Sequence, residues 1–179
     1  MKVHPLKLLL GLGLTLLAAS FLSAAPNIDG RWRMDPAKST ALDGWQKMDL
    51  EIATDGSAVS VTYHMQWRST KVSATNHYDT TQSVTSDDYF RVEQRHMAVY
   101  PTKHGTTTAT ATWLDDGRTL RIEANTSVEV SQGDVPMRLY QEFRVGEMGD
   151  RLTLIELHSS RTRPLVYVFD KLSAEEAAK

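Results

Sequence analysis

Apolar and polar residues alternate along most of the chain beyond residue 29. This period of two is typical of β-strands that turn one face to a core and the other to water. Residues 46–54 carry Met48, Leu50 and Ile52 at alternate positions. Residues 57–68 carry Val59, Val61, Tyr63, Met65 and Trp67 in the same way. The two runs predict a β-hairpin whose apolar side chains share one face.

Two Asp-Gly pairs predict the turns of two hairpins, because Asp-Gly favours two-residue β-turns. Asp55-Gly56 at the central turn positions would place Ile52 opposite Val59, Leu50 opposite Val61 and Met48 opposite Tyr63. Asp116-Gly117 would likewise place Trp113 opposite Leu120, Ala111 opposite Ile122 and Ala109 opposite Ala124. Each register gathers apolar residues on one face, which supports the strand assignment.

Further alternating runs predict strands over residues 71–78, 89–100, 135–145, 150–158 and 165–170, with Pro101, Gly133 and Pro136 in the connections. About eight to ten antiparallel strands with short sequential turns favour an all-β, up-and-down barrel, because closure removes exposed strand edges. A two-sheet sandwich is the alternative. Residues 173–179, rich in Ala and Glu, are expected to form a polar tail with some helical tendency.

The first 25 residues have the three parts of a secretory signal peptide. Lys2 and Lys7 give a positive start, residues 8–19 form a short apolar core, and small residues end at Ala24 and Ala25. Cleavage after Ala24 or Ala25 would leave a single domain, residues 26–172, and its tail in the periplasm or outside the cell. A retained anchor is the competing interpretation, but the apolar stretch is short for a span of about 20 residues and no basic stop-transfer segment follows.

Composition narrows the possible functions. Removal of residues 1–25 would leave 154 residues, a size suited to one domain. These residues include 18 basic and 22 acidic side chains, a net charge of −4, which argues against a nucleic-acid binder with a basic face. The chain has no Cys, so disulfides, thiolate catalysis and Cys-ligated zinc are excluded. No motif requires a cofactor.

Three segments resemble a known family. Residues 30–39, Gly-Arg-Trp-Arg-Met-Asp-Pro-Ala-Lys-Ser, are similar to the opening of bacterial exported lipocalin-like proteins, which begin with Gly-x-Trp and a Pro-x-Lys-Ser segment. Residues 113–120 resemble their central hairpin, and residues 166–171 resemble their closing strand with its terminal basic residue. The resemblance covers most of residues 29–171 and implies a calycin-type β-barrel.

In lipocalins the Trp of the first strand packs at the closed end of the barrel, beneath a basic side chain from near the last strand. The resemblance implies that Trp32, just after Gly30, pairs with Lys171, with Arg163 as the alternative partner. A long cation can lie on the ring while its charge reaches water. We expect Gly30, Trp32 and Lys171 to be structural.

The resemblance also implies a carrier or sensor that holds a small hydrophobic or amphipathic molecule in the barrel. The alternation predicts that the ligand is lined by Tyr63, Met65, Trp67, Phe90, Gln94, His96, Gln141, Phe143 and Glu156. A tight turn near Met148-Gly149 would place Phe143 opposite Leu154 and Gln141 opposite Glu156. Gln141 and Glu156 would then form a polar pole that orients the head group of the ligand.

Other interpretations use the same residues. The barrel can be solid, with its polar residues hydrogen-bonded as a plug, and act as a structural or interaction module through its loops. A register shift of one residue would put those polar residues in water. His96 as base and Glu156 as acid would suit isomerisation or cyclisation of a hydrophobic substrate, although the chain has no Gly-x-Ser-x-Gly elbow. The five histidines beyond the leader lack metal-ligand spacing, so no metal site is predicted.

Overall fold

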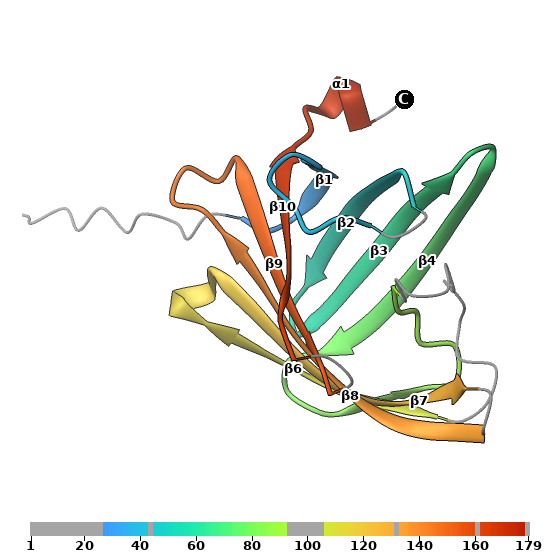
Figure 1. Cartoon of the computed structure of the whole chain (residues 1–179). Helices are drawn as coiled ribbons and strands as arrows, with labels where there is room; N and C mark the ends of the chain where they lie inside the picture. Colours follow the sequence, from blue (N-terminus) through green and yellow to red (C-terminus); the bar gives the residue numbers. More distant parts are fainter. Residues whose placement is uncertain (1–26, 43–44, 93–105, 131–132, 160–161, 178–179) are drawn as a thin grey trace, which may run out of the picture.

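A computed structural model describes residues 27–42, 45–92, 106–130, 133–159 and 162–177. Its regular elements are ten strands, a 3-10 turn and one short helix. In chain order they are β1 (Gly30–Met34), β2 (Lys47–Asp55), β3 (Ala58–Trp67), β4 (Thr70–Asp79), β5 (Val84–Ser86), β6 (Thr107–Leu114), η1 (Asp115–Gly117), β7 (Thr119–Val130), β8 (Gly133–Val145), β9 (Arg151–His158), β10 (Leu165–Lys171) and α1 (Ala174–Ala177). The helix α1 projects from one end of the sheet, beyond β10 (Figure 1).

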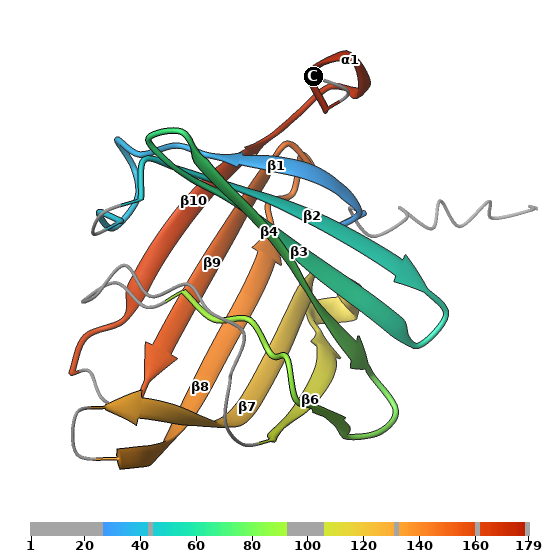
Figure 2. The same cartoon turned by 90° about the vertical axis from the view of Figure 1, so that its right-hand side faces the viewer.

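The ten strands form one continuous antiparallel sheet in the order β4-β3-β2-β1-β10-β9-β8-β7-β6-β5. Neighbours in the sheet are also neighbours in the chain, except where the first strand pairs with the last. That pairing curls the sheet round, and β4 at one edge comes into contact with β5 and β6 at the other (Figure 2). The predicted all-β up-and-down barrel is therefore confirmed, as a nearly closed barrel and not as a sandwich.

The edge strands β4 and β5 are not paired with each other, which leaves an opening in the sheet between them. Side chains of β4 bridge this opening to residues 89 and 90, which follow β5. The Asn76 amide accepts from the backbone N–H of Phe90 at 2.7 Å and donates to its carbonyl oxygen at 2.8 Å. The hydroxyls of Tyr78 and Tyr89 are hydrogen-bonded at 3.0 Å. The Asn76 amide thus takes the place of a neighbouring strand for one residue, Phe90. The predicted strand over 89–100 is wrong in its described part, because residues 89–92 contain only a single bridge, at Phe90. Residues 93–100 lie outside the described residues.

The first hairpin has the predicted faces but a different register. Asp55 pairs with Ala58, so Gly56 and Ser57 are the central turn residues instead of Asp55 and Gly56. Gly56 has a φ of +59°, and a glycine at the first central position is typical of a type II′ turn. Each partner is shifted by two residues, so Leu50 pairs with Tyr63 instead of Val61. A shift of two leaves every side chain on its predicted face, because the period of a strand is two.

The other two predicted registers are confirmed. Trp113 pairs with Leu120 across η1, and the pairs Ala111–Ile122 and Ala109–Ala124 follow from it. Gln141 pairs with Glu156, and Phe143 with Leu154, across the turn at residues 146–150. Alternate residues of these strands are buried in one continuous apolar core that fills the inner face of the barrel.

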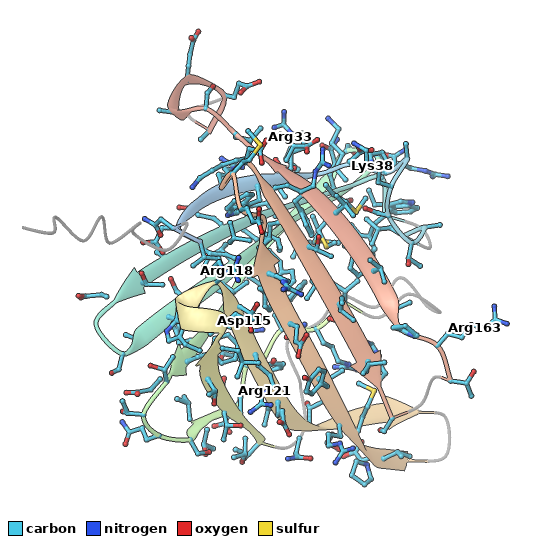
Figure 3. The ribbon with its side chains drawn as sticks, turned by 90° about the vertical axis from the view of Figure 1, so that its left-hand side faces the viewer. Arg33, Lys38, Asp115, Arg118, Arg121 and Arg163 are labelled. Atoms are coloured by element: carbon cyan, nitrogen blue, oxygen red, sulfur yellow. The ribbon has the colours of Figure 1, made fainter. Side chains whose placement is uncertain are left out.

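The first and last strands meet at Trp32 and Lys171, which are paired in the sheet. Trp32 is fully buried, and Lys171 Nζ lies 4.9 Å from the centroid of its ring. Gly30, with a φ of +126°, leaves room for this contact, because a Cβ there would lie 3.0 Å from Lys171 Cε. Arg163 precedes the opposite end of β10 and projects outward, far from Arg33 on β1 (Figure 3), so Lys171 is the cation over Trp32.

Candidate functional site

Three polar side chains of β8 and β9 lie on the inner face of the barrel. Gln141, Glu156 and His158 are 4%, 3% and 5% exposed. Glu156 and His158 are two residues apart on β9, so they share a face, and Gln141 of β8 pairs with Glu156. The flanking inward positions are Phe143, Leu154 and other apolar residues. The sheet register therefore gathers these polar groups inside an apolar core.

Hydrogen bonds join the three side chains to Tyr63 of β3. The Glu156 carboxylate contacts His158 Nε2 through Oε1 at 2.5 Å and accepts from Gln141 Nε2 through Oε2 at 2.5 Å. Gln141 Nε2 also donates to Tyr63 Oη at 3.2 Å. Because β3 lies five places from β8 in the sheet, this last contact reaches across the barrel. We call Tyr63, Gln141, Glu156 and His158 the inner polar cluster.

Two atoms of the inner polar cluster have no hydrogen-bond partner in the part of the chain that the structure describes. They are Gln141 Oε1 and His158 Nδ1, and both are inaccessible to water. A buried polar atom without a partner costs about 1–3 kcal/mol. Buried polar groups in folded proteins are satisfied in most cases, so these two atoms require an explanation.

Buried tyrosines extend the polar character toward the opening between β4 and β5. Burial raises the pKa of Tyr63 well above its usual value, and the neighbouring Tyr78 and Glu156 raise it further. Burial and then the nearby Tyr89 raise the pKa of Tyr78 in the same way. The pKa of Tyr89 is also raised, first by burial and then by Tyr63. These phenols stay neutral at ordinary pH and act as hydrogen-bonding groups.

Most residues predicted to line a ligand lie together on the inner face. Buried among these are Tyr63, Met65, Phe90, Gln141, Phe143 and Glu156. The rings of Tyr63 and Phe90 are 5.1 Å apart. Trp67 differs, because it is partly exposed at the end of β3, where Arg68 lies 4.7 Å from its ring centroid. Gln94 and His96 lie outside the described residues.

Sequence reasoning missed His158, Tyr78 and Asn76 as interior residues. His158 has the same parity as Leu154 and Glu156 on β9, and this spacing was the signal that could have identified it. Asn76 and Tyr78 likewise alternate on β4. Their contacts with residues 89 and 90 come from closure of the barrel, which has no local signature in the sequence.

The inner polar cluster suits hydrogen bonding and proton transfer more than metal or anion binding. A carboxylate holds one nitrogen of His158, which leaves Nδ1 as the atom able to donate or accept a proton. No Lys or Arg is among the buried residues of the described chain. The described residues also contain no group of three or more His, Asp or Glu side chains that could hold a metal ion.

Solved structures similar to this chain include the following two. One is a fatty-acid-binding protein in brain tissue of Drosophila melanogaster, with 13% identity over 78% of this chain and 95% of that chain and a TM-score of 0.47. The other is secretory abundant heat soluble protein 4 from Ramazzottius varieornatus, with 13% identity over 81% and 94% and a TM-score of 0.47. No protein-family model and no curated protein matches the chain. Likeness at this level does not identify a ligand, and the barrel rests on its own strand pairing.

Proposed function

We propose that this protein binds a small hydrophobic or amphipathic molecule inside the barrel, with the head group of the ligand at the inner polar cluster. The observation that carries the proposal is the pair of buried atoms without partners, Gln141 Oε1 and His158 Nδ1. Ligand sites are mostly apolar and contain a few polar groups that fix orientation. The inner face of this barrel has that composition.

The energetics favour a binding role over a plug that only fills the barrel. Glu156 is satisfied by His158 and Gln141, so the cluster is partly a self-contained network. A network that is only partly satisfied is less stable than an apolar core of the same volume. A ligand that bonded the two remaining atoms would complete the network.

We also propose that the protein works outside the cytoplasm, in the periplasm or as a secreted carrier. The proposal is supported by the leader over residues 1–25, with cleavage after Ala24 or Ala25. The contact of Lys171 with Trp32 supports kinship with exported lipocalin-like proteins. Within the described residues, no helix is long and apolar enough to cross a membrane.

Native mass spectrometry of the protein purified from its own host, followed by solvent extraction, tests the binding proposal. We expect an added mass that is released by solvent, and we expect the emptied protein to bind the dye Nile red. The triple variant Gln141→Leu/Glu156→Leu/His158→Leu removes the polar groups together and should lose the added mass. The matched control, Arg138→Gln/Arg151→Gln, neutralises exposed charges on the same two strands and should keep it.

Two outcomes would reject binding in the barrel. One is a protein with no added mass that also fails to bind Nile red, which would favour a solid barrel acting through its loops. The other is equal retention of the extracted molecule by the triple variant and the control. Circular dichroism of both variants shows whether the barrel is intact.

A further inference from the structure

We infer that the inner polar cluster selects a ligand with a neutral head group that both donates and accepts a hydrogen bond, such as a hydroxyl or a carboxamide, and rejects a carboxylate. This inference rests on the proposed binding function and specifies its ligand class. It follows from which polar atoms of Glu156, His158 and Gln141 carry hydrogens.

The first step is the charge of the buried contact between Glu156 and His158. Both side chains are at most 5% exposed, and burying a lone charge is costly. The pair avoids a net charge in two forms, carboxylate with imidazolium or carboxylic acid with neutral imidazole. In both forms one proton lies between Glu156 Oε1 and His158 Nε2, and Nδ1 carries a hydrogen of its own. The unpartnered nitrogen of His158 is therefore a donor.

The second step is the orientation of the Gln141 amide. Its nitrogen faces Glu156 Oε2 and Tyr63 Oη, both of which can accept. If the amide were turned over, its oxygen would face a carboxylate oxygen that has no hydrogen to give. The nitrogen is therefore fixed on the side of Glu156, and the unpartnered Oε1 is an acceptor.

A hydroxyl or a carboxamide complements this donor and this acceptor with one group. A carboxylate does not, because it has two acceptor oxygens and no hydrogen for Gln141 Oε1. It would also bring a negative charge into an interior where the buried described residues include no Lys or Arg to offset it. Burying a charge without an opposite partner is costly.

Calorimetry of the solvent-extracted protein with four ten-carbon ligands at pH 8 tests the inference. The ligands are 1-decanol, decanamide, decyl methyl ether, which accepts but cannot donate, and decanoate, which is ionised. We expect 1-decanol and decanamide to bind about tenfold more tightly than the ether, the effect of one buried hydrogen bond. We expect decanoate to bind at least about tenfold more weakly than 1-decanol.

The variant Gln141→Leu removes the acceptor, so the alcohol should lose its advantage over the ether. The control Gln82→Leu changes an exposed glutamine after β4 and should keep that advantage. Should the Gln141 variant fail to fold, the ligand series on the unchanged protein still decides the question.

The results separate the inference from the proposed function. Tighter binding of decanoate than of 1-decanol, or equal binding of the alcohol and the ether, overturns the inference while leaving the binding function in place. A water molecule that satisfied both atoms would give the second result. Failure of all four ligands and of Nile red to bind overturns the proposed function itself.

Discussion

Alkaline pH should unfold this protein through its buried tyrosines. Tyr63, Tyr78 and Tyr89 all have a pKa raised above the usual 10.0, mainly by burial. Below about pH 10 the phenols are protonated in the folded and the unfolded state, so they do not affect stability. Above pH 10 only the unfolded state releases these protons, and the free energy of unfolding therefore falls as pH rises.

The size of the effect follows from the number of tyrosines. One phenol that ionises only in the unfolded chain lowers the free energy of unfolding by about 1.4 kcal/mol between pH 9 and pH 11. Three such phenols lower it by about 4 kcal/mol over the same interval. That is a large share of the roughly 5–15 kcal/mol that stabilises a typical domain.

Urea unfolding at pH 9, 10, 10.5 and 11, followed by circular dichroism, measures this loss. The variant Tyr78→Phe/Tyr89→Phe removes both hydroxyls of a hydrogen-bonded pair. The buried Asn76 amide also loses its hydrogen bond to Tyr78, so we expect the stability at pH 7 to fall by about 1–3 kcal/mol. The variant should lose about 3 kcal/mol less than the unchanged protein between pH 9 and pH 11. Lysines and exposed tyrosines titrate equally in both proteins and cancel in the difference.

Equal losses in the two proteins would refute the burial of these phenols. So would tyrosinate absorbance at 295 nm that rose near pH 10 in the folded protein by the amount expected of every tyrosine. Either result would mean that water reaches Tyr78 and Tyr89, and that the side of the barrel between β4 and β5 is open to solvent.

Two further substitutions test the closure of the barrel. Gly30→Ala places a Cβ 3.0 Å from Lys171 Cε at a φ of +126°, and we expect it to lower the free energy of unfolding in urea by about 1–3 kcal/mol. The control Gly56→Ala, at a φ of +59° with nothing within 4 Å, should lower it by about 1 kcal/mol. An equal loss for both variants would contradict the packing at Lys171. Asn76→Ala leaves the N–H and the carbonyl of Phe90 without the Asn76 amide, which should lower the free energy of unfolding by about 2–4 kcal/mol and speed hydrogen exchange at the Phe90 amide. The control is Asn125→Ala, at an exposed asparagine. Unchanged exchange in the Asn76 variant would show that another group holds Phe90.

The sequence predicted the faces of the strands better than their partners. Alternation alone placed Leu50, Ile52 and Tyr63 inside, and their burial confirms it. The first register was wrong by two because Asp55-Gly56 permits two turn placements, and the preference of Gly56 for the first central position decided between them. A register error of two residues leaves every side chain on the same face of its strand, so the predicted core residues were still correct.

Closure of the barrel could be predicted in part. The β1–β10 pairing followed from the family resemblance at Trp32 and Lys171. The opposite side depends on Asn76, whose amide bonds the backbone of Phe90 fourteen residues away. A contact between a side chain and a distant backbone group leaves no periodic signal, and the regular run around Phe90 predicted a strand in its place.

In the candidate site too, the sequence predicts contacts within a hairpin but not contacts that depend on closure of the barrel. A tight turn was enough to predict that Gln141 meets Glu156, because hairpin partners follow from local spacing. The contact of Gln141 with Tyr63 joins residues 78 positions apart and exists only because the sheet curls round. His158 was within reach of the alternation rule, yet the prediction assigned the interior histidine to His96, which lies outside the described residues.

The energies of the interior bear on the choice between a solid core and a binding site. Gln141 Oε1 and His158 Nδ1 together cost about 2–6 kcal/mol while they lack partners. Apolar side chains of similar volume would remove that cost, so filling the barrel does not explain the cluster. A neutral head group that bonds both atoms also removes it, and does so only on binding. In the proposed function, the free energy that weakens the barrel as a core contributes to the affinity and the selectivity for the ligand.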